Sequence, residues 1–139
     1  MIAVSGSGIA GLAAALAILR NQKPLLLVAG STPATTLHGG VQIAPNGWAA
    51  LDQLGLGDVA RARATTLQAI TVRDMRSTAT LASLDLSASL YASLSRAELA
   101  SLLKAEISAA SGMTHIAANI THLVQRGPDQ GKALHMLTD

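Results

Sequence analysis

The stretch VSGSGIAGL, from Val4 to Leu12, decides the fold. It carries the glycine pattern Gly6-x-Gly8-x-x-Gly11, directly after a short apolar run and at the start of an Ala- and Leu-rich segment from Ile9 to Asn21. A short apolar run of this kind is typical of a buried parallel strand, and the segment that follows is typical of a helix. The pattern therefore predicts a strand, a tight turn and a helix.

A second strand is predicted after this helix, in the stretch PLLLVAGSTP from Pro24 to Pro33. Proline cannot continue a helix, so Lys23-Pro24 ends the first one. Leu25 to Ala29 is again continuously apolar and is bounded by glycine and proline, which favours a buried strand. Strand, glycine turn, helix and strand together predict a βαβ unit.

The glycine turn has the properties of a dinucleotide site. Gly6 permits the tight turn, Gly8 lets the backbone approach a pyrophosphate, and Gly11 lets the helix pack closely on the strand. The N–H groups that open the helix, at Ile9 and Ala10, then face the phosphates at its positive end. We therefore expect these five residues to bind a pyrophosphate. A purely structural tight turn is the alternative.

The acidic residue that usually completes such a site is missing. A carboxylate is expected about 20 residues past the loop, where it holds an adenosine ribose. Ala29 occupies that place, and no Asp or Glu occurs before Asp52. Ser31 can offer a neutral hydrogen bond instead. A charge-assisted hydrogen bond contributes roughly 1.5–3 kcal/mol, so its loss should weaken nucleotide binding without abolishing it.

Further elements follow along the chain. Ser95 and Glu98 form a capping box, and Asn46 is a candidate N-cap. The expected elements are a strand over 41–44, helices over 47–54, 57–64 and 95–110, a hairpin of 67–74 with 81–86, and three short strands over 114–117, 120–124 and 133–137.

Composition excludes several classes of function. The net charge of +2 is scattered, so nucleic-acid binding is not expected, and the absence of cysteine excludes disulfides and thiolate sites. The apolar run over 8–19 is too short for a membrane span of about 20 residues. His115, His122 and His135 have a spacing that suits no single metal site. The expectation is a cytoplasmic protein with no metal.

Two later blocks carry a family resemblance. The stretch HGGVQIAPNGWAALDQLGLGD, from His38 to Asp58, and the stretch SLSRAELASLL, from Ser93 to Leu103, follow the glycine loop in order and spacing. All three blocks resemble segments of the flavin-dependent aromatic hydroxylases, the single-component FAD monooxygenases related to p-hydroxybenzoate hydroxylase.

This resemblance implies an α/β, Rossmann-like FAD-binding fold with a small additional β-hairpin or sheet. Residues 1–139 would form a single, partial domain of this kind, a truncated form of the family fold. The glycine loop would hold the FAD pyrophosphate, Gly39 and Gly40 would pass near the flavin, and Arg96 would reach the FAD. In the family, NADH or NADPH reduces FAD, and oxygen then serves to hydroxylate a small aromatic substrate.

The later segments of the family pattern do not occur in these 139 residues. We therefore expect that these 139 residues do not turn over substrate alone. We also expect the unpaired edges of their sheet to favour self-association or binding of a complementing chain. Two alternatives stay open. One is an NADP-binding domain, although no Arg or Lys follows the second strand up to Ala60. The other is a non-catalytic remnant that keeps the fold.

Overall fold

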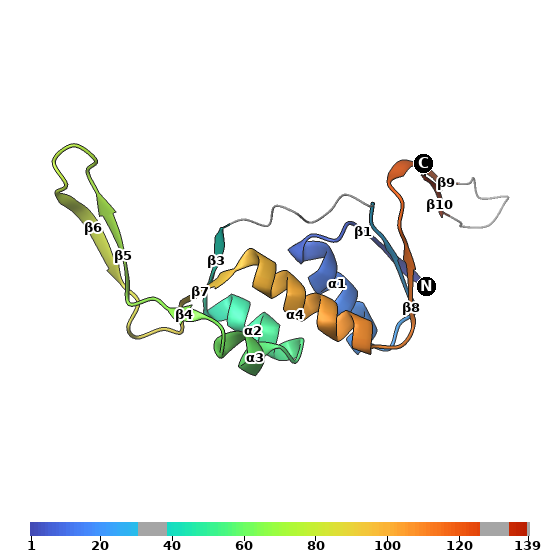
Figure 1. The fold of residues 1–139 in the computed structure, drawn as a ribbon, viewed down its shortest axis with the longest axis horizontal. Helices are drawn as coiled ribbons and strands as arrows, with labels where there is room; N and C mark the ends of the chain where they lie inside the picture. The colour runs from blue at the N-terminus through green and yellow to red at the C-terminus, as the bar shows by residue number, and fades with distance from the viewer. Residues whose placement is uncertain (31–38, 126–133, 139) are drawn as a thin grey trace. The chain divides into compact units, whose positions relative to one another are not determined.

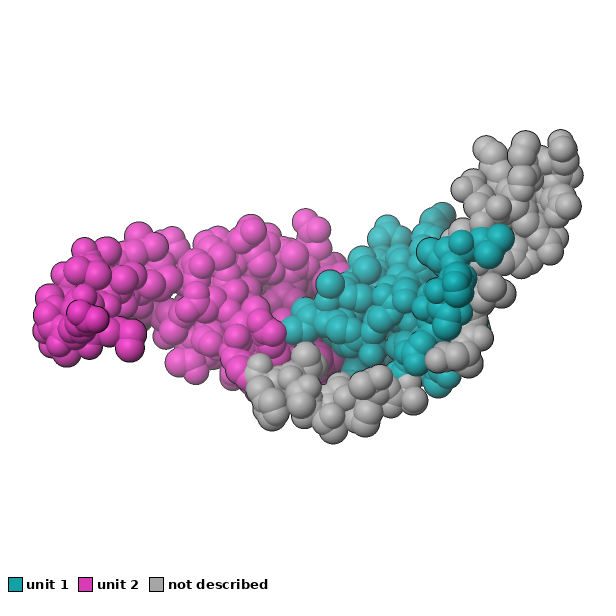
Figure 2. All heavy atoms as spheres, turned by 90° about the horizontal axis from the view of Figure 1, so that it is seen from above, with its two compact units in different colours: residues 1–36, 103–139 teal, residues 37–102 magenta. Residues whose placement is uncertain are grey.

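The computed structural model describes residues 1–30, 39–125 and 134–138. The chain folds into two compact units, which are coloured separately in Figure 2. Unit 1 comprises residues 1–36 and 103–139, and unit 2 comprises residues 37–102. Each unit contains both helix and strand, so the mixed α/β class predicted from the sequence is confirmed.

A parallel sheet forms the centre of unit 1 (Figure 1). β1 (Ile2–Ser5) and β8 (Met113–Ile116) flank β2 (Leu25–Val28), and both pairings are parallel. The register places Leu27 of β2 opposite His115 of β8. Every residue of β2 is buried, as expected for a central strand of a parallel sheet. The predicted βαβ unit is therefore present.

The helix of this βαβ unit is α1 (Ile9–Arg20), which packs against β1 and β2. Its buried face has the spacing of one helix stripe and consists of Leu12, Ala15, Leu16 and Leu19. Burying one leucine side chain contributes about 1.5–3 kcal/mol, so this stripe holds the helix on the sheet. Arg20 forms an exposed ion pair with Glu106 at 2.6 Å, and this pair contributes little to stability.

Unit 2 is built on an antiparallel sheet of β3 (Gly40–Ile43), β7 (Ala92–Ser95) and β4 (Thr65–Thr66), with β7 in the middle. Two short helices follow β3 in the chain, α2 (Pro45–Gln53) and α3 (Gly57–Arg61). The buried hydrophobic residues among the described part of unit 2 are Ile43, Trp48, Leu51, Leu56, Ala60, Leu86, Ala92, Leu94, Leu99, Ala100 and Leu102.

The predicted hairpin is also present in unit 2, as β5 (Ala69–Arg73) and β6 (Thr80–Asp85). Both strands are largely exposed on both faces, and Figure 1 shows them projecting as a two-stranded ribbon. The turn is closed by Asp74, whose carboxylate accepts the backbone N–H and hydroxyl of Ser77 at 2.6 and 2.8 Å. These hydrogen bonds lower the pKa of Asp74.

The longest helix is α4 (Arg96–Ala109), whose first residues belong to unit 2 and whose later residues belong to unit 1. The Ser95 hydroxyl accepts the backbone N–H of Glu98 at 3.1 Å, which confirms that Ser95 caps this helix. Beyond β8, β9 (Ile120–Gln125) and β10 (Leu134–Thr138) pair antiparallel in unit 1. No helix within the described residues is both long and apolar enough to cross a bilayer.

Two sequence predictions in unit 2 need correction. Asn46 is not an N-cap, because α2 begins one residue earlier at Pro45 and Ala44 is its N-cap. Proline suits the first helical position, since its φ is already helical and it has no N–H to leave unpaired. The helix predicted over 57–64 ends at Arg61, because Ala64 N–H bonds to Arg61 O in a tighter turn.

A polar cluster joins α2 to α3. The Arg61 guanidinium donates to the Asp52 carboxylate at 2.6 Å and lies 5.2 Å from the ring centroid of Trp48, which is buried. A Cβ at Gly57 would collide with the Asp52 carboxylate, so a larger residue here would displace the side chains of this cluster. The hydrogen bond from Arg61 holds the pKa of Asp52 below its usual range.

This lowered pKa of Asp52 predicts a pH dependence of stability. A folded-state pKa below the unfolded one stabilises the fold above the unfolded value, and this contribution is lost as pH falls through the folded pKa. We expect Asp52→Asn to lower the free energy of unfolding in urea at pH 7, and to have a smaller effect at pH 3. The contact of Asp58 with Arg61 is longer, at 3.4 Å, so Asp58→Asn serves as the control. If Asp52→Asn lowers the free energy of unfolding by the same amount at both pH values, the ionised Asp52 carboxylate does not stabilise the fold.

Candidate functional site

The glycine turn connects β1 to α1 in the geometry that the sequence predicts. Gly6 has a φ of +99°, a left-handed conformation that favours glycine, and its N–H bonds to Val28 O at 2.8 Å. Gly8 is the N-cap of α1, and its backbone is extended. The turn is therefore tied to the carboxyl end of β2 before the helix begins.

The N-terminus of α1 is left without a side-chain cap. Gly8 has no side chain, and the first turn of α1 carries no acidic residue. The N–H groups of Ile9, Ala10 and Gly11 have no carbonyl partner within the helix, because the first four N–H groups of a helix lack one. Together with the positive end of the helix dipole, they form a suitable site for an anion.

The three glycines differ in the space around them. A Cβ at Gly11 would collide with the carbonyl oxygen of Gly6, so only glycine allows the helix to approach the turn. A Cβ at Gly6 or Gly8 would meet no atom of the described residues within 4 Å, apart from those of its neighbours in the chain. The turn thus presents bare backbone to open space at Gly6 and Gly8, which is the surface that a phosphate group needs.

The carboxyl end of β2 lies beside this turn. Ala29 is buried, and its N–H bonds to Ile116 O at 3.1 Å. A Cβ at Gly30 would collide with the side-chain amide of Asn119. Ser31 lies outside the described residues. The end of β2 therefore offers no carboxylate to a ribose, as the sequence predicts.

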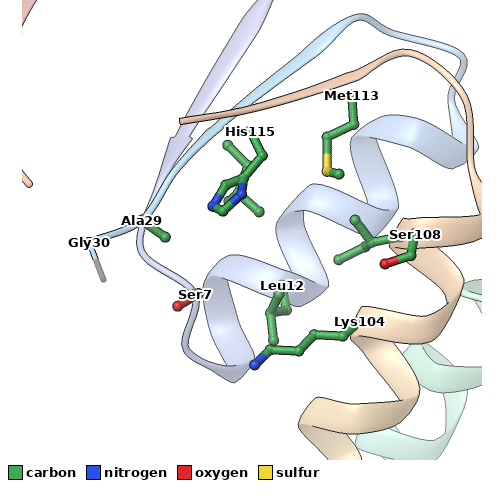
Figure 3. Close-up of a pocket in the computed structure, with 10 residues that line it drawn as sticks. Ser7, Leu12, Ala29, Gly30, Lys104, Ser108, Met113 and His115 are labelled. Carbon is green, nitrogen blue, oxygen red and sulfur yellow. The ribbon is translucent and has the colours of Figure 1, made fainter. Parts of the chain in front are cut away.

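A cavity of about 330 Å³ opens at this point in unit 1 (Figure 3). This volume lies within the range of small-ligand pockets. Residues of the glycine turn, α1, β2, β8 and the later part of α4 line it: Ser7, Leu12, Leu27, Ala29, Gly30, Lys104, Ile107, Ser108, Met113 and His115. None of these lining residues is acidic. Lys104 and Ser108 could not be predicted from the sequence, because no local pattern shows which face of α4 lines this cavity.

The remaining predicted site residues lie together in unit 2. The N–H of Arg96 bonds to Gly39 O at 3.1 Å, and Gly40 pairs with Ser95 in the sheet. Gly39 has a φ of +86°, and a Cβ at Gly40 would come within 2.9 Å of the Ser93 hydroxyl. The structure therefore brings Gly39, Gly40 and Arg96 into contact through their backbones, although they lie far apart in the sequence.

The side chain of Arg96 is exposed and makes no hydrogen bond or ion pair with the described part of the chain. Another arginine of unit 2 differs, since Arg63 lies 3.4 Å from the carboxylate of Glu98. The Arg96 guanidinium is thus available to an anionic or polar ligand.

The amino-acid sequence is also similar to those of known enzymes. The 3-hydroxybenzoate 6-hydroxylase of Klebsiella oxytoca is 38% identical over 71 residues, which are 51% of this chain and 18% of that enzyme. The FAD-dependent monooxygenase pytG of Aspergillus terreus is 37% identical over 71 residues, which are 51% of this chain and 21% of that protein. No protein-family model matches the chain.

The fold agrees with these sequence matches. The crystal structure of p-nitrophenol 4-monooxygenase PnpA from Pseudomonas putida matches with a TM-score of 0.75, at 20% identity, over 95% of this chain and 37% of that one. This chain therefore spans about a fifth of the length of the two curated relatives and about a third of that structure. The predicted resemblance to flavin-dependent aromatic hydroxylases is confirmed.

Proposed function

We propose that this chain supplies the FAD-binding part of a flavin-dependent monooxygenase. One observation carries the proposal: a glycine turn and an uncapped helix N-terminus adjoin a cavity that Ser7 of the turn lines and whose lining contains no acidic residue. The sequence identity of 37–38% to aromatic hydroxylases and an FAD-dependent monooxygenase supports the same cofactor.

The pyrophosphate of FAD would lie against Gly6 and Gly8. The open space beside these two glycines would accommodate the phosphate oxygens, and the N–H groups of Ile9, Ala10 and Gly11 would donate to them. Gly11 would act indirectly, by allowing α1 to pack against the turn. These roles require only the backbone, so they do not depend on the identity of any side chain.

The adenosine end would lie at Ala29 and Gly30, where the cavity begins. Without a carboxylate, the ribose loses a charge-assisted hydrogen bond, which costs about tenfold to a hundredfold in affinity. We propose that Ser31 replaces part of this contact with a neutral hydrogen bond. Affinity for FAD would then be moderate.

The flavin end would involve Gly39, Gly40 and Arg96, the residues that the family resemblance assigns to it. Support comes from the exposed Arg96 guanidinium, which has no ion pair with the described residues, and from Gly39, whose carbonyl accepts the backbone N–H of Arg96. Arg96 would position the cofactor by a charge-assisted hydrogen bond.

When bound, FAD would supply the redox and oxygen chemistry, and the protein would hold the cofactor and keep water out. The whole reaction is proposed for a protein that includes this chain: NADH or NADPH as reductant, oxygen, and hydroxylation of a small aromatic substrate. Three expectations stay predictions. They are that these residues do not turn over substrate alone, that they self-associate, and that they act in the cytoplasm.

A titration of the chain with FAD tests the proposal. We expect saturable quenching of flavin fluorescence, with an affinity about tenfold weaker in Arg96→Ala, because one charge-assisted hydrogen bond is removed. Arg76→Ala is the control, since Arg76 is an exposed arginine in the turn between β5 and β6. A folded chain that binds no FAD would refute the proposed function and favour the non-catalytic remnant.

A second candidate, an NADP-binding domain, has one observation in its favour. Lys104 lines the cavity at Ala29 and can supply the cation that a 2′-phosphate needs, although it lies far from β2 in the sequence. A parallel titration with NADP distinguishes the two functions. Saturation by NADP but not by FAD would select this second candidate.

A further inference from the structure

We propose that Lys104 binds a phosphate group of an adenine nucleotide in the cavity beside the glycine turn. The inference takes from the proposed function only the placement of a nucleotide in this cavity. It adds a side-chain ligand to a site whose other phosphate contacts come from backbone.

The first argument is the position of Lys104. Ser7, from the glycine turn, and Leu12, from the first turn of α1, line the cavity together with Lys104. Figure 3 shows the side chain extended along the cavity, with its ammonium group toward the first turn of α1. Ile107 and Ser108 line the same cavity, as expected for residues one turn further along a helix face. Lys104 therefore lies on the cavity face of α4.

The second argument is electrostatic. A cation near a helix N-terminus is unfavourable in itself, because both carry positive charge. No carboxylate relieves this arrangement: Lys104 makes no ion pair with the described residues, and Glu106 of the same helix pairs with Arg20 instead. An anion bound between the ammonium group and the helix N-terminus would relieve the repulsion. The site is therefore suited to a group with negative charge.

The third argument is the loss of the usual acidic residue. Ala29 lines the same cavity as Lys104, so a carboxylate at this position would add a negative charge to the cavity and would repel an anionic ligand. With alanine at this position, the charge of Lys104 remains available to the ligand. In this proposal the ligand loses an ionic contact at its ribose and gains one at a phosphate, from a lysine that has no ion pair with the described residues.

Isothermal titration of the full chain tests this role. We expect Lys104→Gln to weaken binding of adenosine 5′-diphosphate about tenfold, to leave the binding of adenosine unchanged, and to reduce the salt dependence of binding. Lys104→Arg should keep most of the affinity, because the charge is retained. Lys23→Gln removes the same charge from an exposed lysine of unit 1 outside this cavity, and should have no effect.

A third ligand, adenosine 2′-monophosphate, separates the two sources of phosphate. Weaker binding of the 5′-diphosphate in Lys104→Gln places Lys104 at the pyrophosphate, whereas weaker binding of the 2′-monophosphate alone places it at the ribose. Equal affinities in wild type and Lys104→Gln, or an equal loss for adenosine itself, would overturn the inference. Binding of adenosine 5′-diphosphate without binding of FAD would refute the proposed function and leave this inference standing.

Discussion

Gly8→Val is expected to abolish FAD binding while the chain stays folded. The new side chain would fit into the free protein, because a Cβ at Gly8 meets no atom of the described residues beyond its chain neighbours within 4 Å, and the backbone there is extended, with φ −72° and ψ 172°. The branched side chain would instead occupy the space that the phosphate needs. Losing two charge-assisted hydrogen bonds at roughly 1.5–3 kcal/mol each lowers the affinity more than about a hundredfold.

Fluorescence titration and thermal unfolding together test the role of Gly8. Valine is a poorer N-cap than glycine, so we expect a loss of stability of about 1 kcal/mol or less. Ala14→Val is the matched control, since it makes a branched side chain on the exposed face of α1, away from the turn. It should bind FAD like wild type. An FAD affinity of Gly8→Val within threefold of wild type would show that the phosphate does not approach this glycine.

The elements predicted well are those specified by local sequence. The apolar runs over Leu25–Val28 and the stripe of α1 each follow one period, so their structure could be predicted from neighbours in the chain. The same holds for Ser95, because a capping box is a local motif. Asn46 failed as a cap because a stronger local signal, proline at the first helical position, starts the helix at Pro45 instead of Gly47.

The candidate site was predictable only where a motif covers it. The glycine turn was found from its spacing, and the contact of Gly39 with Arg96 agrees with the family resemblance. Lys104 was missed because its role depends on which face of α4 lies toward the cavity, and the sequence pattern of α4 does not specify its neighbour. The charge of the site is thus determined by tertiary packing, which no local pattern contains.

Gly11→Ala is expected to destabilise the fold by about 2–3 kcal/mol. Two effects compete at this position. Alanine in place of glycine within a helix should stabilise by about 1 kcal/mol. However, the new Cβ would collide with the carbonyl oxygen of Gly6, a backbone atom that cannot rotate away. Gly6 is itself held by its hydrogen bond to Val28 O and by its left-handed φ, so the steric cost should exceed the gain.

Urea unfolding of Gly11→Ala beside Gly47→Ala measures this competition directly. Gly47 also lies in a helix, but its Cβ would come within 3.0 Å of the γ2 methyl of Ile43, a side-chain atom that needs to shift by only a few tenths of an ångström. We therefore expect Gly47→Ala to change the free energy of unfolding by less than about 1 kcal/mol, in either direction. If Gly11→Ala is no less stable than Gly47→Ala, the turn shifts to accept the methyl group. Gly11 would then not be needed for the close approach of α1 to the turn. Packing would not explain why the third position of the glycine pattern is glycine.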